Sequence, residues 1–253
     1  MIHIKSQREI QLMREAGAVA DTCMSQVEAM VQPGVTTGEI DRMAEAFIRG
    51  AGGIPTFLGY GGYPASLCIS INDVVVHGIP DRRKLAQGDI VSIDLGVTLG
   101  GYVADMARTF ACGTISKEAE DLIQATRESF YKGMEQMVPG NRLGDVSHAV
   151  GSYAESLGYG VVRDLCGHGV GSQMHEDPEV PNYGTPGRGV RLRSGMVLAV
   201  EPMITAGTWR VNFMPDGWSV MTADGSLAAH YENTVAITDE GPVILTTANP
   251  GGR

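Results

Sequence analysis

The chain has 253 residues, which is enough for one large domain or two small ones with a sizeable core. Its 19 Lys and Arg residues against 29 Asp and Glu residues give a net charge of −10, and no Lys- or Arg-rich run offsets it, so the composition argues against nucleic-acid binding. The nearest pair of its four cysteines, Cys68 and Cys112, lies 44 positions apart, so we expect reduced thiols rather than disulfides or a zinc knuckle.

Two helices are predicted in the first fifty residues from their capping signals. Ser6 and Glu9 form a capping box, and apolar residues then recur at helical spacing until the Pro-Gly pair at 33–34. Thr36 and Glu39 form a second box, which opens a helix to about residue 50. Charged residues in the first of these helices break up any signal-peptide core, and no apolar run approaches the roughly 18 residues of a membrane span. We therefore expect a soluble cytoplasmic protein without a membrane partner.

The remaining predicted elements are two more helices and a series of strands. Ser116 is the expected cap of a helix to about residue 138, and another helix follows at about 143–157. The predicted strands are residues 66–71, 90–95, 102–110, 197–204, 211–214, 218–222 and 228–237. Two helices followed by strands thus occur twice. This order indicates an α/β (α+β) fold, with a single domain over residues 1–253 made of two pseudo-equivalent halves at about 1–113 and 114–253.

Two segments of the same shape support this duplication, and each ends in a carboxylate. Residues 88–94 and 195–201 open with glycine, continue in a run rich in β-branched residues and close six positions later, with Asp94 and Glu201. A carboxylate that ends an apolar strand has to be paired, protonated or bound to a metal. Glu232, inside another apolar strand, meets the same condition. The alternative for each glutamate is a buried acid bonded to arginine or to backbone amides.

Asp105 joins this set through the predicted hairpin of residues 90–110. If Leu99 and Gly100 form a two-residue turn, Asp94 lies directly opposite Asp105, with Cβ atoms roughly 4.5–5.5 Å apart. Two like charges at this separation destabilise a strand pair unless a cation lies between them. The simpler explanation, two aspartates that merely flank a turn, is weakened by the buried glutamates.

Histidines complete the candidate site. His168 lies between glycines, where its imidazole can approach a metal closely, although lone histidines are more often structural. His77 and His175 lie at a strand end or in a loop and suit acid–base or oxyanion roles near neutral pH. His230, two residues before Glu232, is a candidate outer partner of the site.

Four carboxylates and one imidazole are more hard ligands than one ion requires, and about what two bridged ions require. This donor set suits Mn²⁺, Fe²⁺, Co²⁺ or Zn²⁺. Such a pair of ions lowers the pKa of a bridging water and polarises a carbonyl or phosphoryl oxygen. The residues alone therefore predict metal-assisted hydrolysis and leave peptide, amide and phosphoester substrates open.

The sequence also resembles the type I methionine aminopeptidase family nearly from end to end. The matching segments are residues 4–17, 33–37, 62–64, 68–72, 76–80, 88–94, 167–171 (Gly-His-Gly-Val-Gly), 174–178 (Met-His-Glu-Asp-Pro), 201–203, 216–218 and 230–234. Their order and spacing together are highly specific. The resemblance implies the pita-bread fold, in which two pseudo-symmetric halves share an antiparallel sheet with helices on its outer face.

By this resemblance, two divalent ions (Co, Mn, Fe or Zn) are the expected cofactors, and the five metal ligands are Asp94, Asp105, His168, Glu201 and Glu232. The implied reaction removes the initiator methionine from nascent proteins and peptides whose second residue is small. A metal-bridging hydroxide would attack the carbonyl of the first residue. The implied partners are N-terminal methionyl chains and, transiently, the ribosome, and we expect a monomer.

The resemblance also implies roles for single side chains. Glu201 would relay the proton to the leaving amine, His175 would stabilise the gem-diolate oxygen, and His77 would contact the nitrogen of the scissile amide. The implied methionine pocket consists of Phe57, Tyr60, Tyr63, Cys68, Met174 and Trp218. Aromatic and sulfur walls suit a thioether, although the family position that matches Phe57 is often small.

One departure from the family leaves alternatives open. Residues 101–109 read Gly-Tyr-Val-Ala-Asp-Met-Ala-Arg-Thr, where many family members have His-Gly before the aspartate, and the Arg-Thr pair is also typical of proline-specific peptidases of this fold. The first alternative is therefore an Xaa-Pro peptidase, which usually carries an additional N-terminal domain. The others are a non-catalytic binding protein of this fold, which typically lacks metal ligands, and a phosphoesterase, which normally has a Lys/Arg cluster to hold phosphate.

Overall fold

Four α-helices and fifteen strands are present in the computed structural model, which describes residues 1–248. The helices are α1 (Gln7–Met30), α2 (Thr37–Gly50), α3 (Lys117–Met134) and α4 (Leu143–Ser156), with a short 3-10 turn, η1 (Tyr60–Gly62). The strands are β1 (Ile54–Pro55), β2 (Leu67–Ile71), β3 (Val74–Val76), β4 (Ile90–Leu99), β5 (Tyr102–Ala111), β6 (Gly160–Val161), β7 (Gly167–Gly169), β8 (Glu176–Val180), β9 (Val197–Val200), β10 (Met203–Thr205), β11 (Val211–Phe213), β12 (Val220–Thr222), β13 (Ala228–His230), β14 (Glu232–Thr238) and β15 (Gly241–Ile244).

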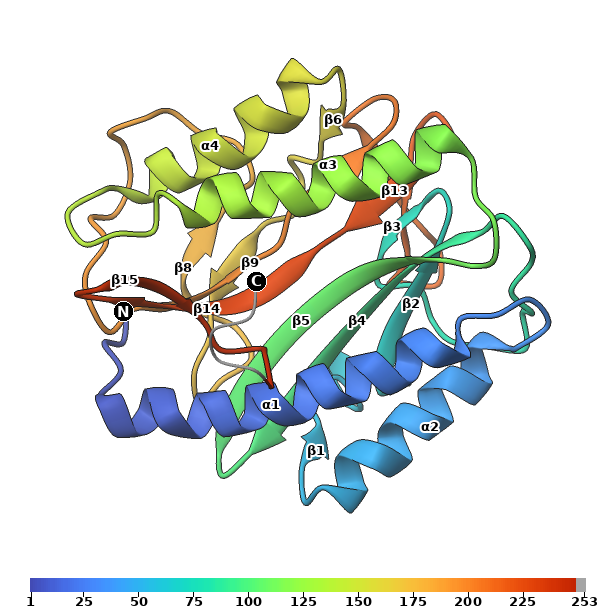
Figure 1. Ribbon diagram of the computed structural model, residues 1–253, viewed down its shortest axis with the longest axis horizontal. Helices are drawn as coiled ribbons and strands as arrows, with labels where there is room; N and C mark the ends of the chain where they lie inside the picture. The colour runs from blue at the N-terminus through green and yellow to red at the C-terminus, as the bar shows by residue number, and fades with distance from the viewer. Residues whose placement is uncertain (249–253) are drawn as a thin grey trace.

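One large antiparallel sheet forms the centre of the molecule. Its strand order is β1-β4-β5-β14-β9-β7-β8, with β2 beside β4 and β15 beside β14. Two small sheets adjoin it, in the orders β13-β10-β6 and β11-β12-β3. Figure 1 shows α1 and α2 along one side of the strands and α3 and α4 along the other. Among residues 1–248, none of the helices has both the length and the apolar character that a membrane span requires.

The helix starts agree with the capping signals in the sequence. The Glu9 backbone N–H donates to the Ser6 hydroxyl at 3.4 Å, and the Ser6 N–H donates back to the Glu9 carboxylate at 2.7 Å. Thr36 and Glu39 repeat this box at α2. The predicted end of the third helix is wrong, because α3 stops at Met134 and residues 135–138 continue in tighter turns.

Two of the predicted strands are interrupted beside the candidate ligands. Residues 197–204 divide into β9 and β10 at Glu201 and Pro202, since proline has no N–H for the sheet. Residues 228–237 divide into β13 and β14 at Tyr231, whose N–H donates instead to the Pro202 carbonyl at 3.2 Å. Both segments pass at this point between the large sheet and the small sheet β13-β10-β6, in which Met203 lies opposite His230.

The predicted turn of the β4–β5 hairpin lies one residue too early, so the predicted register is wrong by two positions. The turn is Gly100-Gly101 rather than Leu99-Gly100, and the two glycines have φ values of +59° and +83°. A two-residue hairpin turn of type I′ needs positive φ at both central positions, which glycine adopts without strain. Asp94 therefore lies opposite Ala107, and Asp105 lies opposite Gly96. The two aspartates are diagonal neighbours on one face rather than directly opposed residues.

The central strands have the same neighbours in both parts of the chain. β4 lies between β2 and β5, and β9 lies between β7 and β14, while β5 and β14 pair with each other. One apolar cluster packs α1 and α2 onto β2 and β4, and another packs α3 and α4 onto β9 and β14. The candidate carboxylates are thus placed where the two sets of strands meet. The division at about residue 113 into two halves stays a prediction.

Candidate metal centre and adjoining pocket

A cavity of about 140 Å³ lies beside the central strands. It is lined by Phe57, Tyr60, Tyr63, Cys68, His77, Asp94, Asp105, His168, Met174, His175, Glu201, Trp218 and Glu232. The structure therefore brings together every residue that the sequence predicts as a ligand, an acid–base group or a pocket wall. Their individual chemical roles stay predictions.

Five elements that are neighbours in the sheet supply the candidate ligands. Asp94 comes from β4, Asp105 from β5, His168 from β7, Glu201 from the end of β9 and Glu232 from the start of β14. His168 lies in a short strand, β7, that pairs with both β8 and β9. Glycine is required on both sides of it, because a Cβ at Gly167 would lie 2.3 Å from the Ala199 oxygen and one at Gly169 would lie 2.2 Å from the Asp177 oxygen.

Several buried polar atoms of the site have no hydrogen-bond partner among the described residues. They are Asp94 Oδ1, Asp105 Oδ1, Glu232 Oε1 and His230 Nε2. Buried polar atoms in proteins are normally paired, and unpaired carboxylates are costly to bury. Asp105, His168 and Glu232 bring one potential ligand atom each within 4.8 Å of one another, and so do Glu201, His230 and Glu232. These residues therefore fit divalent cations, which would supply the missing partners.

The carboxylates perturb one another strongly. Burial raises the pKa of Asp94 well above its usual range, and the nearby Asp105 and Glu201 raise it further. Burial likewise raises the pKa of Glu232, with added repulsion from Asp105 and Glu201. Burial and the neighbouring charges thus favour the protonated forms of these two carboxyl groups, whereas a bound metal would favour the ionised forms.

His168 points one ring nitrogen at the carboxylates. Its Nε2 lies 3.6 Å from Asp105 Oδ2 and 3.7 Å from Glu201 Oε1, while its Nδ1 lies 2.9 Å from the Gly169 carbonyl. Burial alone would lower the pKa of this imidazole, but Asp105 and Glu201 outweigh burial and raise it. With Nδ1–H donating to the carbonyl, Nε2 is the atom available to a metal.

The other two histidines of the cavity are less basic. Burial lowers the pKa of His77, and burial together with the adjacent His168 lowers the pKa of His175. The Tyr60 hydroxyl lies 2.7 Å from His175 Nδ1, and the rings of His168 and His175 lie 4.2 Å apart. His77 has φ of +60°, a left-handed conformation that is uncommon outside glycine. Such strain occurs often at functional sites, and nothing in the sequence around His77 signals it.

Aromatic and sulfur side chains form the rest of the cavity wall. Trp218 packs edge-on against Tyr63 with ring centroids 5.0 Å apart, and the Tyr63 hydroxyl donates to the Leu67 carbonyl at 2.9 Å. Phe57 is held over Gly96, where a Cβ would lie 2.8 Å from its ring. Burial raises the pKa of the Cys68 thiol, so the sulfur presents a neutral surface. The pocket is therefore apolar beside a highly polar centre.

Side chains outside the predicted set hold the ligand strands in place. The Thr234 hydroxyl accepts from the Asp105 N–H and donates to the Asp105 carbonyl, both at 2.9 Å. The Arg108 guanidinium donates to the Glu232 carbonyl and lies 4.2 Å from the Tyr231 ring centroid. The sequence gives only a weak signal for these partners, because they follow from the strand register.

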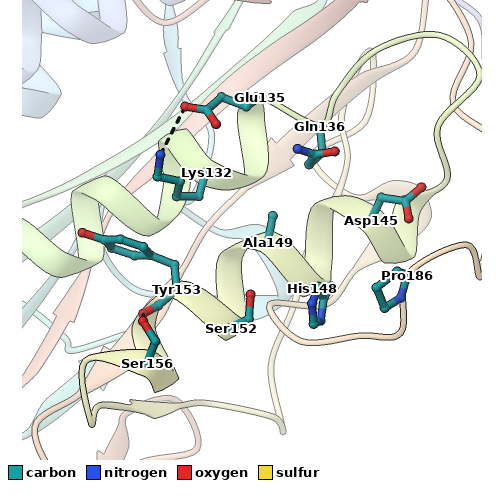
Figure 2. A pocket seen from close by; sticks show the side chains of 10 residues that line it. All are labelled: Lys132, Glu135, Gln136, Asp145, His148, Ala149, Ser152, Tyr153, Ser156 and Pro186. Carbon is teal, nitrogen blue, oxygen red and sulfur yellow. Dashed lines mark hydrogen bonds and ion pairs between the residues drawn. The ribbon is translucent and has the colours of Figure 1, made fainter.

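A larger cavity lies elsewhere on the molecule. Its volume is about 530 Å³, and it is open to solvent over α3 and α4. Figure 2 shows its lining, which includes His148 from α4 and the Lys132–Glu135 ion pair of 3.5 Å. None of the predicted ligands lines this cavity.

Comparison with known proteins points to one group of enzymes. Residues 11–239 match metallopeptidase family M24. A methionine aminopeptidase of Clostridium acetobutylicum is 58% identical over 247 residues, which are 97% of this chain and 99% of that protein. Methionine aminopeptidase 1 of Bacillus subtilis is 47% identical over 246 residues, with coverage of 97% and 99%.

Solved structures give the same result for the fold. The crystal structure of a methionine aminopeptidase from Thermotoga maritima matches with a TM-score of 0.96 at 44% identity and covers 98% of this chain and 100% of that chain. A prolidase from Pyrococcus furiosus matches with a TM-score of 0.75 at 23% identity and covers 96% of this chain and 65% of that chain. The likeness to the prolidase is one of fold alone.

Proposed function

The chain belongs to metallopeptidase family M24, and on this premise we propose that it is a metal-dependent aminopeptidase that releases the N-terminal methionine of peptides and nascent proteins. Its fold is the pita-bread fold that the sequence resemblance implied. One observation supports the proposal independently of the relatives. Buried carboxylates with oxygens that lack hydrogen-bond partners line the same cavity as a thiol, a thioether and several aromatic side chains.

Two divalent ions are the proposed cofactors, with Co, Mn, Fe or Zn as the candidates. The residues that would hold them are Asp94, Asp105, His168, Glu201 and Glu232. When bound, such ions would activate a water and polarise the scissile carbonyl. The fit rests on the oxygen-rich donor set with one imidazole and on the buried oxygens that lack partners.

Three side chains of the cavity have proposed roles around the scissile bond. Glu201 passes the proton from the attacking water to the leaving amine. With the Tyr60 hydroxyl donating to Nδ1, His175 keeps its proton on Nε2 and donates it as a hydrogen bond to the oxygen that becomes negative during attack. The lowered pKa of His175 favours this neutral, singly protonated ring near neutral pH. His77 contacts the nitrogen of the scissile amide.

The apolar wall is the proposed site for the methionine side chain. Dispersion and sulfur–aromatic contacts with Tyr63, Trp218 and Met174 favour a flexible thioether over a branched side chain. The second residue of the substrate is expected to be small. The proposed substrates are newly made chains, which implies a cytoplasmic enzyme that meets the ribosome transiently, and we propose that it acts as a monomer.

A peptide pair distinguishes this function from proline-specific cleavage. Metal-stripped protein is reconstituted with Mn²⁺ or Co²⁺ and offered Met-Ala-Ser together with Ala-Pro-Ala. We expect release of methionine that is lost in Asp105→Asn and kept in the surface control Asp121→Asn, whose side chain pairs with Lys117 on α3. Cleavage of the proline peptide alone would refute the proposal.

A further inference from the structure

His230 lies beside the metal centre but outside the five predicted ligands. Its side chain is only 2% exposed, and its Nε2 has no hydrogen-bond partner among the described residues. This atom lies 3.6 Å from Glu201 Oε2 and 3.9 Å from Glu232 Oε2. A buried ring nitrogen aimed between two carboxylates without a hydrogen bond requires an explanation.

The backbone of His230 is fixed in the same manner as that of a predicted ligand. The Thr109 hydroxyl accepts from the His230 N–H and donates to the His230 carbonyl, both at 2.9 Å. Thr234 binds Asp105 in this way on the other side of the Ala107–Glu232 pair. Ser92 on β4 bonds Thr109 at 2.8 Å and so ties this arrangement to a third strand. These hydrogen bonds fix the backbone of His230 and so hold its imidazole beside the metal centre.

Glu201 is shared between two imidazoles, one for each carboxylate oxygen. His168 Nε2 faces Oε1 at 3.7 Å, and His230 Nε2 faces Oε2 at 3.6 Å. The two histidines differ in access, because His168 lines the cavity and His230 does not. Glu201 Oε1 is therefore the oxygen on the side of His168, which lines the cavity, and Oε2 is the oxygen on the side of His230.

We infer that His230 is a positioning residue, whose Nε2–H donates a hydrogen bond to Glu201 Oε2 and so holds Oε1 towards the metal and the substrate. The separation of 3.6 Å is longer than a hydrogen bond of about 2.7–3.2 Å, so the proposed bond would require Glu201 Oε2 to lie closer to Nε2 in the metal-bound protein. Ligating carboxylates are commonly oriented by such outer partners. The effect on turnover rests on the proposed function of Glu201, whereas the effect on metal binding does not.

Two substitutions separate hydrogen bonding from packing. His230→Gln keeps a side-chain N–H that can reach Oε2, and His230→Leu fills similar space without a donor. In Co²⁺ titrations without substrate, we expect His230→Leu to bind roughly 10–100-fold more weakly than wild type and His230→Gln to recover most of this loss. At saturating Co²⁺ with Met-Ala-Ser, kcat should fall in the leucine variant with little change in KM, and the glutamine variant should have a kcat close to that of wild type.

Thermal unfolding of the metal-free proteins checks that both variants fold. His148→Leu on α4 is the control, and it should match wild type in all of these measurements.

Three results would overturn the inference. The first is a leucine variant with wild-type Co²⁺ affinity, and the second is a glutamine variant as weak as the leucine variant. The third comes from the NMR spectrum of the Co²⁺-loaded wild type, in which each ligating imidazole gives one exchangeable, strongly shifted N–H signal. A single such N–H signal that is lost in His168→Gln would support the positioning role of His230. Two such signals would show that His230 is itself a metal ligand. Because affinity and spectrum need no substrate, failure of the methionine assay would refute the proposed function and leave this inference to be decided separately.

Discussion

Repulsion among buried carboxylates is the main physical feature of the site at the scale of single residues. Burial, together with the charges of Asp105 and Glu201, raises the pKa values of Asp94 and Glu232 and so favours their protonated forms. A divalent cation reverses this preference, since it pairs with the ionised forms and displaces their protons. The same residues are therefore costly without metal and stabilising with it.

This reversal predicts a pH-dependent effect of metal on stability. The folded-state pKa values of Asp94 and Glu232 lie above the ordinary values of 3.8 and 4.5, so the stability that these acids contribute to the metal-free protein is present below those values and is lost as pH rises. The increase in Tm on adding Mn²⁺ should therefore grow between about pH 5 and about pH 8. Calorimetry of paired samples measures it, and the double variant Asp94→Asn/Glu232→Gln should show little growth. A constant or shrinking increment in wild type would contradict this account.

The chemical identity of the site residues could be predicted from the sequence, but their backbone strain and their support could not. Glu201 and Glu232 stand out because carboxylates rarely end or interrupt apolar runs. The left-handed conformation of His77 has no local signature, since the surrounding valines favour an ordinary strand. The bonds of Thr234 to Asp105 depend on which residues lie opposite each other across two strands far apart in the chain.

At the scale of elements, the β4–β5 hairpin sets the relative positions of two predicted ligands. Its glycine turn makes Asp94 and Asp105 diagonal neighbours, and a slip of one residue would move one of them to the opposite face of the sheet. The prediction that Asp94 and Asp105 share one face of the sheet is nevertheless correct. The register differs by two positions, and residues two positions apart on a strand point to the same face.

The turn predicts unequal tolerance of its two glycines. Gly100→Asn should leave the free energy of unfolding nearly unchanged, because asparagine tolerates positive φ and Asn-Gly is a favoured primed turn. Gly101→Val should destabilise by about 1–2 kcal/mol, since a β-branched residue is strained at φ of +83°. Urea unfolding compares the two variants, and equal midpoints would refute the proposed turn.

Strand ends and small strands were the elements that the sequence predicted least well. Pro202 explains the division of residues 197–204, and the division at Tyr231 follows from its bond to the Pro202 carbonyl rather than from any local signal. The two-residue strand β6 pairs with β10, which lies far away in the chain, and so gives no local signal of its own. The capping boxes of α1 and α2, by contrast, are local and were predicted correctly.

At the scale of the whole molecule, the first helix packs on the last part of the described chain. A Cβ at Gly17 in α1 would lie 2.0 Å from the Leu245 carbonyl oxygen, which is backbone and cannot turn aside. α1 also packs along β4 and β5, which carry Asp94 and Asp105. Close approach at Gly17 therefore places α1 against Leu245 and Thr246, beside the central strands.

Gly17→Ala tests this contact against helix propensity. Alanine favours a helix over glycine by about 1 kcal/mol, but the clash with Leu245 should leave the variant destabilised by about 1–3 kcal/mol. Gly50→Ala in α2 is the matched control, because its Cβ would meet nothing within 4 Å and should be neutral or stabilising. Thermal unfolding distinguishes them, and a stabilised Gly17→Ala would contradict the close packing.

In the proposed enzyme, a metal centre and an adjoining pocket for methionine act together on one substrate. The most direct measurement titrates Co²⁺ or Mn²⁺ into metal-free protein and follows the initial rates on Met-Ala-Ser and Leu-Ala-Ser, which differ only in the first side chain. Methionine release should rise with added metal, while leucine release should stay far lower at every metal concentration. Methionine release that is independent of metal, or equal release of the two residues, would contradict it.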